Sequence, residues 1–144
     1  MAKPLGTKVG MLKGSIRIIA DARLRDFEAL WKAGHFHSAV YMAGYAVEGY
    51  LKCAICKTLK IPQLPTDFEF HNLEPLLFYS GFYYELMSDT VVHPSFLGIQ
   101  KFWKVEMRYD DPTLSSIDDK TCILLDTWLN DSVKGLVPWF RSRL

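Results

Sequence analysis

The chain has 144 residues, with 17 basic and 16 acidic side chains and a formal net charge of +1. This balance argues against a strongly electrostatic nucleic-acid binder, although it leaves room for a local basic strip. Hydrophobic residues make up 49% of the chain and aromatic residues 14%, so a well-packed core is expected and wholesale disorder is excluded.

The length fits one ordinary domain. Glycines and a proline recur through residues 1–15, which predicts a flexible N-terminal lead-in, and we expect residues 16–144 to form a single helical domain. No apolar run approaches the roughly 18 residues of a membrane span, and Met1–Gly14 lacks the apolar stretch of a secretory signal. We therefore expect a cytoplasmic protein that does not enter a membrane.

The three cysteines do not form a disulfide or metal pattern. Cys53 and Cys56 lie about one turn apart inside a predicted helix, and Cys122 is distant in the sequence. A zinc site needs further ligands at suitable spacing, and a redox pair needs its first thiol at a helix N-terminus. We predict buried, reduced, structural cysteines, and we expect neither a metal nor a cofactor.

The first two helices are predicted with the clearest pattern. The first runs from Ile16 until Gly34 ends it, with apolar residues every three or four positions on one face. The second runs from Ser38 to about Leu59 and is apolar or small almost all round, which predicts the central helix of a bundle. Because the corner between them is short, they should be antiparallel neighbours.

The rest of the chain predicts shorter helices. Asn72 caps a third helix that Gly81 ends, and residues 82–92 are expected to be helical despite a β-branched run. A further helix opens at Pro94, and its inward face consists of Phe96, Ile99, Trp103 and Met107. Ser115 or Ser116 caps the last helix, whose inward face consists of Leu124, Leu125, Trp128, Leu129, Val133 and Leu136. Since no segment alternates like a strand, the fold class is an all-α antiparallel bundle of four or five helices.

Glu48 is the one carboxylate in the middle of the central helix. At 100° per residue it shares a stripe with His37, Tyr41, Tyr45 and Lys52. It either pairs with Lys52 one turn away, accepts a hydrogen bond from a tyrosine, or orients a base or an arginine in a cleft between helices.

Four segments together resemble the HEPN domain family. They are Ala20-Asp-Ala-Arg23, Ser38-Ala-Val-Tyr-Met-Ala-Gly-Tyr-Ala-Val-Glu48, His71-Asn-Leu and Trp103-Lys-Val-Glu-Met-Arg-Tyr109, and the match covers roughly residues 16–135. The resemblance implies a helical bundle packed as a homodimer. It also implies a role in a prokaryotic toxin–antitoxin, defence or stress system, with a nucleotidyltransferase or an antitoxin as partner.

Many HEPN proteins are metal-independent ribonucleases that carry an arginine and, four to six residues later, a histidine. Arg108 matches the arginine and Glu48 matches a supporting polar residue, but Thr113, Leu114 and Ser115 occupy the histidine positions. RNA cleavage at the 2′-hydroxyl needs an acid or base that titrates near working pH, which neither threonine nor serine provides alone.

Other residues carry competing interpretations. His71 either supplies the imidazole from the third helix or orients the loop before Asn72. Arg108, with Lys101 and Lys104, either contacts phosphates or forms a solvated face. The two following residues, Asp110 and Asp111, either neutralise Arg108 or hold its guanidinium in a fixed fork.

The aromatic residues and the remaining histidines complete the candidates. Trp103 and Tyr109 either stack on a ligand or pack in the core or at a dimer seam. His35 and His37 flank a helix start and do not make a metal site alone. The sequence shows no Gly-rich phosphate loop and no Ser-His-Asp arrangement.

Three functional hypotheses follow. The first is a non-catalytic or atypical HEPN protein that binds RNA, a nucleotide or a protein partner, with Arg108, Tyr109, Trp103, Lys104 and Lys101 as contact residues. The second is a metal-independent ribonuclease; no catalytic residue is assigned firmly, and its candidates are Arg108, Glu48 and His71. The third is a structural dimeric interaction module. A homodimer also fits the 20 aromatic residues, which exceed what a small core readily covers.

Overall fold

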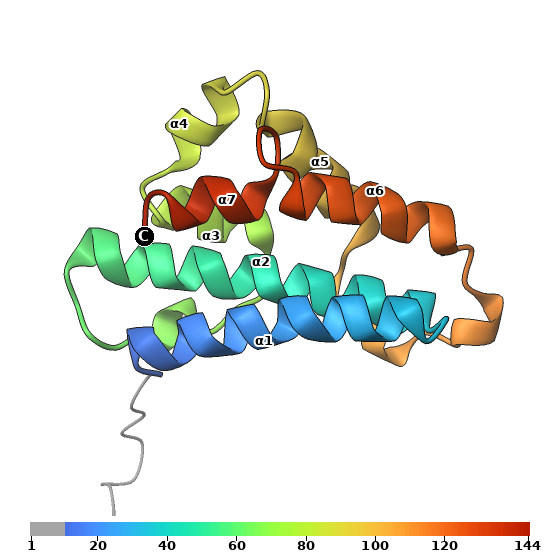
Figure 1. Cartoon of the computed structure of the whole chain (residues 1–144). Helices are drawn as coiled ribbons and strands as arrows, with labels where there is room; N and C mark the ends of the chain where they lie inside the picture. The colour runs from blue at the N-terminus through green and yellow to red at the C-terminus, as the bar shows by residue number, and fades with distance from the viewer. Residues whose placement is uncertain (1–10) are drawn as a thin grey trace, which may run out of the picture.

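The computed structural model describes residues 11–144, and within them the fold is all-α with seven α-helices, three short 3-10 helices and no strand (Figure 1). The predicted fold class is therefore confirmed. These residues contain more helices than the predicted four or five, partly because the last predicted helix is divided into two. Residues 1–10 of the predicted lead-in lie outside the described residues, and helix α1 already begins at Lys13.

Helices α1 (Lys13–Lys32) and α2 (Phe36–Leu59) form a long antiparallel pair, as predicted (Figure 1). Gly34 lies between them with φ of +80°, a left-handed conformation that residues with a Cβ rarely adopt. This residue lets the chain reverse within residues 33–35. The inward face of α1 is the predicted one, with Ile16, Ala20, Leu24 and Phe27 buried.

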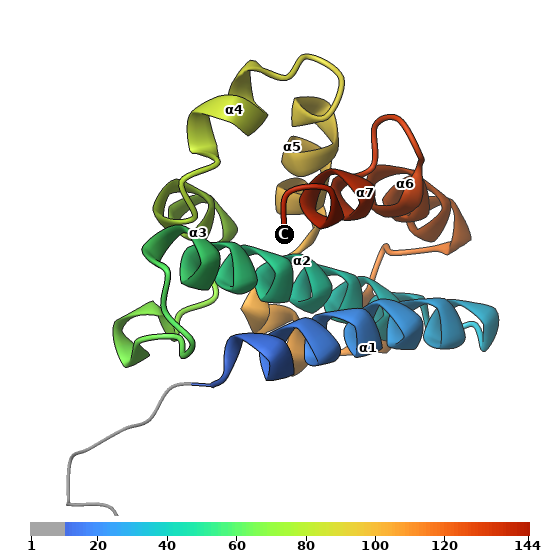
Figure 2. The ribbon, with the colours of Figure 1, turned by 60° about the vertical axis from the view of Figure 1, so that its left-hand side comes forward.

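Helix α2 is the central helix of the bundle. Figure 2 shows α1 packed on one side of it and α3, α5, α6 and α7 on the other. Its buried residues therefore occur on all sides of the helix, and they are Ala39, Val40, Ala43, Gly44, Ala46, Val47, Glu48, Tyr50, Leu51, Cys53, Ala54, Ile55 and Cys56. The apolar surround of this helix in the sequence is thus explained by neighbours on several sides.

Helices α3 (Leu73–Tyr79), α4 (Tyr83–Ser88) and α5 (His93–Phe102) follow on the side of α2 away from α1 (Figure 2). A short 3-10 helix, η1 (Thr66–Phe68), precedes them. Asn72 is the N-cap residue of α3 and Gly81 follows the helix with φ of +82°, so the predicted limits of this helix are confirmed. Residues 82–92 form one short helix and a turn.

The helix predicted from Pro94 to beyond Met107 is shorter than expected. Helix α5 ends at Phe102, and Trp103 and Lys104 are extended. The chain then forms the 3-10 helices η2 (Val105–Tyr109) and η3 (Pro112–Leu114). All four residues of the predicted inward face are buried nonetheless. The apolar spacing therefore predicted burial correctly, but it predicted too long a helix.

The last predicted helix is two helices, α6 (Asp119–Asn130) and α7 (Leu136–Arg141), which follow one another above α2 (Figure 1). The N-cap is Asp118 rather than a serine: its carboxylate accepts from the Thr121 backbone N–H, and the Thr121 hydroxyl accepts from the Asp118 N–H. The turn at Asp131 leaves Val133 73% exposed, so this residue does not belong to the core. Leu124, which was also predicted on the inward face, is 46% exposed because it lies on the outer side of α6.

All three cysteines are buried free thiols, as predicted. Burial raises the pKa of Cys53 to about 12 and that of Cys122 to about 11. Within residues 11–144, no helix is both long and apolar enough to cross a bilayer.

Candidate functional site

The site is built on a close packing of Trp103 against Gly44. A Cβ at Gly44 would lie 2.0 Å from Cγ of Trp103, so only glycine leaves room for the indole on this face of α2. The indole N–H donates to the Tyr41 carbonyl at 2.9 Å, and Tyr45 packs edge-to-face on the ring with centroids 5.7 Å apart. Trp103 is only 4% exposed, so it is a packing residue that holds the 103–109 segment on α2.

Glu48 and His71 meet directly. Oε1 of Glu48 lies 2.5 Å from Nδ1 of His71 and accepts from Nζ of Lys52 at 3.2 Å. Glu48 is only 4% exposed, whereas the His71 side chain is 39% exposed. Two of the alternatives predicted for Glu48, the ion pair with Lys52 and the contact that orients a histidine, are therefore both present. With Nδ1–H directed at Glu48, the other ring nitrogen, Nε2, is left to act as an acceptor.

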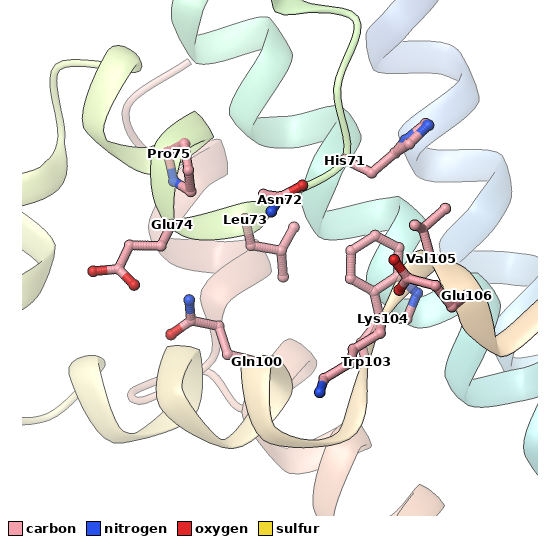
Figure 3. Close-up of a pocket in the computed structure, with 10 residues that line it drawn as sticks. All are labelled: His71, Asn72, Leu73, Glu74, Pro75, Gln100, Trp103, Lys104, Val105 and Glu106. Carbon is pink, nitrogen blue, oxygen red and sulfur yellow. The ribbon is translucent and has the colours of Figure 1, made fainter.

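Two cavities adjoin His71. One, of about 340 Å³, is bounded by the start of α3, the end of α5 and the 103–106 segment. Figure 3 shows the His71 ring pointing away from the other residues that line this cavity. Glu74 and Gln100 lie on the side of the cavity opposite His71. The second, of about 650 Å³, lies on α1 and α2 and is lined by both members of the Glu48–His71 pair and by Lys52.

A pair of tyrosine hydroxyls lies beside the Glu48–His71 pair. The Tyr41 hydroxyl donates to that of Tyr45 at 3.1 Å, and the Tyr45 ring lies edge-to-face on His71 with centroids 5.9 Å apart. Burial, the bond with Tyr41 and the charge of Glu48 raise the pKa of Tyr45 to about 12, and Arg108 partly opposes this. The pKa of Arg108 is raised, chiefly by Tyr109 and then by Tyr41 and Tyr45. The pKa of Tyr45 therefore responds both to Glu48 and to Arg108.

Arg108 is not held by the carboxylates that follow it in the sequence. Asp111 accepts from the backbone N–H of Thr113 at 2.9 Å, and Asp110 approaches Nε2 of His37 at 4.0 Å. Among residues 11–144, Arg108 makes no ion pair; its guanidinium lies over the Tyr109 ring, 4.7 Å from the centroid, and Tyr109 is 76% exposed. An exposed arginine stacked on an exposed aromatic ring is the result.

The three candidate catalytic residues are thus brought together only in part. Glu48 and His71 form a direct pair, while Arg108 lines neither of the two cavities beside His71. Lys101 and Lys104 line a third cavity, of about 620 Å³, beside the N-terminus of α2.

His37 makes contacts that its position in the sequence did not predict. Its Nδ1 lies 2.9 Å from Oγ of Ser115, and its Nε2 lies 2.9 Å from the Met107 carbonyl oxygen. The two side chains are 78 positions apart in the sequence, so no local spacing could have paired them. The fold therefore brings His37 into hydrogen-bond contact with Ser115, while Asp110 lies 4.0 Å from the other ring nitrogen.

The part of the chain that the structure describes contains no group of three or more His, Cys, Asp or Glu side chains placed to hold a metal ion. Comparison with family models, curated proteins and solved structures finds no match to this chain. The relation to the HEPN family therefore stays a proposal, and the function is argued from the geometry of the site.

Proposed function

We propose that this chain is a HEPN-like protein that binds single-stranded RNA through an RNA surface formed by Arg108, Tyr109, Lys101 and Lys104. The observation that carries the proposal is the stacking of the Arg108 guanidinium on the exposed Tyr109 ring, with no ion pair to Arg108 within residues 11–144. Arg108 thereby offers its charge to a phosphate, and Tyr109 offers a face to a base.

The energetics fit a modest, local binding site. Stacking of one base on an aromatic side chain contributes about 1–3 kcal/mol, and it tolerates any base because every base has a π-face. Each neutralised phosphate releases counterions, so affinity falls as salt rises. With a net charge of +1, attraction comes from this surface and not from the protein as a whole.

The test is the affinity of a fluorescein-labelled, mixed-sequence single-stranded RNA, measured by fluorescence anisotropy. The account predicts that Arg108→Ala and Tyr109→Ala each weaken binding by about tenfold. Arg25→Ala is the matched control, because Arg25 is an exposed arginine of α1 that makes no ion pair within the described residues. Equal losses in Arg108→Ala and Arg25→Ala contradict the proposed surface.

Other outcomes separate the remaining ligands. Binding of mononucleotides with the same affinity as RNA favours a nucleotide site, since a longer strand then adds no contact. Absence of binding to both favours a protein partner.

A second candidate is metal-independent RNA cleavage, and the hydrogen bond between Glu48 and His71 favours it. A buried carboxylate that accepts from Nδ1 leaves Nε2 as a base toward the 650 Å³ cavity. In this candidate Nε2 takes the proton of a 2′-hydroxyl, whose oxygen attacks the adjacent phosphorus. The bond from phosphorus to the 5′-oxygen breaks, the ring returns its proton to that oxygen, and a 2′,3′-cyclic phosphate remains. Arg108 contacts a neighbouring phosphate.

Cleavage is tested in the presence of EDTA with the same RNA. The candidate predicts strand scission that His71→Gln and Glu48→Gln abolish and that His35→Gln, a change at an exposed histidine of the α2 N-cap, preserves. If the RNA stays intact with the wild-type protein, the cleavage candidate is contradicted and the binding proposal is unaffected.

The biological setting belongs to the same proposal. A homodimer is supported by exposed apolar side chains on and before α1, namely Leu12, Ile18 and Ile19. The resemblance adds a prokaryotic toxin–antitoxin, defence or stress system and a nucleotidyltransferase or an antitoxin as partner. The cytoplasmic location is proposed from the sequence, in which no apolar run is long enough for a membrane span and Met1–Gly14 has no secretory stretch. Size-exclusion chromatography with light scattering measures the mass of the protein in solution. A monomeric mass at micromolar concentration contradicts the dimer.

A further inference from the structure

A second chemical site lies where the N-terminus of α2 meets the loop before α6. His37, in the first turn of α2, contacts Ser115 through Nδ1 and the Met107 carbonyl through Nε2, each at 2.9 Å. Its side chain is largely buried, so the ring is fixed from both sides. This is the geometry of a histidine that is oriented by one nitrogen and acts through the other.

The hydrogen-bond donors and acceptors settle which way the serine proton points. A carbonyl oxygen only accepts, so Nε2 of the neutral ring carries the hydrogen and Nδ1 is an acceptor. Oγ of Ser115 already accepts from the Ile117 backbone N–H at 3.2 Å. Its own hydrogen is therefore directed at Nδ1, which makes His37 the base for this hydroxyl.

Asp110 completes the arrangement. Its carboxylate lies 4.0 Å from Nε2 of His37, on the side of the ring away from Ser115. When the ring takes the serine proton it becomes a cation, and a carboxylate at this distance stabilises that cation. Ser115 and His37 thus stand in the roles of nucleophile and base, and Asp110 is a nearby carboxylate that favours the ring cation.

The pair opens onto the third cavity, of about 620 Å³, which both His37 and Ser115 line. This volume is in the range of small-molecule sites. Its walls combine the apolar side chains of Phe102, Met107, Leu114 and Ile117 with the ammonium groups of Lys101 and Lys104 and the carboxylates of Glu106, Asp110 and Asp111. A ligand that fits therefore has an apolar part, and the mixed charges of the walls select no single sign of charge.

We propose that Ser115 and His37 are a nucleophile–base pair that hydrolyses a small carboxylic ester with an apolar part. Oγ of Ser115 attacks the ester carbonyl carbon while its proton passes to Nδ1 of His37. The bond to the alcohol oxygen then breaks with its electron pair, and the alcohol leaves with the proton from Nδ1. Water attacks the acyl-serine, gives one proton to Nδ1, and releases the carboxylic acid as Oγ takes that proton back.

This site uses neither Arg108 nor Tyr109, so it stands or falls independently of RNA binding. Only the two lysines are shared with the RNA surface. The site is separate from the Glu48–His71 pair as well, which lines different cavities.

The test uses a fluorophosphonate probe, which phosphonylates activated serines, with mass mapping of the modified peptide. We expect the adduct on Ser115, its loss in Ser115→Ala, and labelling slowed about 100-fold in His37→Gln. Ser116→Ala is the matched control and keeps the wild-type rate, because Ser116 is an exposed neighbour that contacts neither ring nitrogen of His37. No adduct on Ser115, or equal rates in wild type and His37→Gln, overturns the proposal.

The two bonds of His37 also hold the 107–115 segment to α2, so the fold of His37→Gln is checked by circular dichroism. If this variant unfolds, the wild-type protein supplies the comparison, with Ser115 labelled in buffer and in urea. The proposal expects labelling about 100-fold faster in the native state. Equal rates in the two states mean that the bonds serve only to join the segments, and they overturn it.

The substrate class has its own measurement, which is kcat/KM for the hydrolysis of 4-nitrophenyl butyrate. We expect Ser115→Ala to abolish this hydrolysis. Equal kcat/KM in the wild type and in Ser115→Ala contradicts an ester substrate.

Discussion

The substitution Gly44→Ala tests whether the Trp103 packing holds the site together. The new Cβ would lie 2.0 Å from Cγ and 2.1 Å from Cδ1 of Trp103, far inside van der Waals contact. Neither side can yield, because Gly44 is in the middle of α2 and the indole is wedged against the helix with its N–H bonded to the Tyr41 carbonyl. The indole must therefore leave its site.

The magnitude follows from what is lost and gained. Losing a buried tryptophan from a core costs about 3–5 kcal/mol, including its contacts and the space left behind. Replacing glycine by alanine inside a helix returns about 1 kcal/mol. The net expectation for Gly44→Ala is a loss of about 2–4 kcal/mol in the free energy of unfolding. Because Trp103 anchors the 103–109 segment, the affinity for RNA should fall as well.

Urea denaturation followed by circular dichroism measures this change. Gly14→Ala is the control: this glycine lies in the first turn of α1, and a Cβ added there would meet no atom within 4 Å. The same substitution at Gly14 should therefore be neutral or stabilising by up to about 1 kcal/mol. If Gly44→Ala stays within about 0.5 kcal/mol of the wild type, the packing argument is refuted.

Three further predictions concern charges and thiols. Glu48→Gln should lower the free energy of unfolding by about 1.5–3 kcal/mol in urea titrations at neutral pH, because it replaces a buried charged acceptor; no change contradicts this. Burial raises the pKa of Asp21, but hydrogen bonds from Tyr50 and Arg141 outweigh it and hold the pKa below 3.8. A lowered pKa gives stability that is fully present above the unfolded pKa and is lost as pH falls through the folded pKa. The deficit of Asp21→Asn, about 1 kcal/mol at pH 7, should therefore begin to shrink only below about pH 4 and vanish once the pH is below the folded pKa. Burial raises the pKa of Cys53 to about 12, so a disulfide reagent at pH 8 should label it only in denaturant, and rapid labelling of the native protein refutes its burial.

The helices that the sequence predicts best are those whose pattern depends on their own residues. Helix α2 carries an almost continuous apolar surround, and α1 carries a regular stripe, so both were placed within a few residues. The helix after Pro94 was overextended because Trp103 keeps a helical spacing. Its indole instead fits a notch on α2, 62 positions away in the sequence, and the backbone becomes extended to reach it. Local periodicity carries no information about such a notch.

The residues of the candidate site likewise fall into those that the sequence could predict and those that it could not. Glu48 could be singled out because a carboxylate in an apolar helix needs a partner, and His71 was among the few imidazoles available to it. The pairing of His37 with Ser115 could not be predicted, because it depends on how the loop after η2 returns to the N-terminus of α2. Ser115 was assigned to a helix cap, a role that Asp118 takes instead.

The most direct test of the central claim is to map where RNA touches the protein. Photo-crosslinking of 4-thiouridine RNA, followed by mass mapping of the linked peptides, reads the contact without any substitution. The account predicts that crosslinks concentrate on the peptide that carries Arg108 and Tyr109. Crosslinks that fall instead on the other exposed aromatic surface, formed by Phe78 and Tyr84 on α3 and α4, would contradict it.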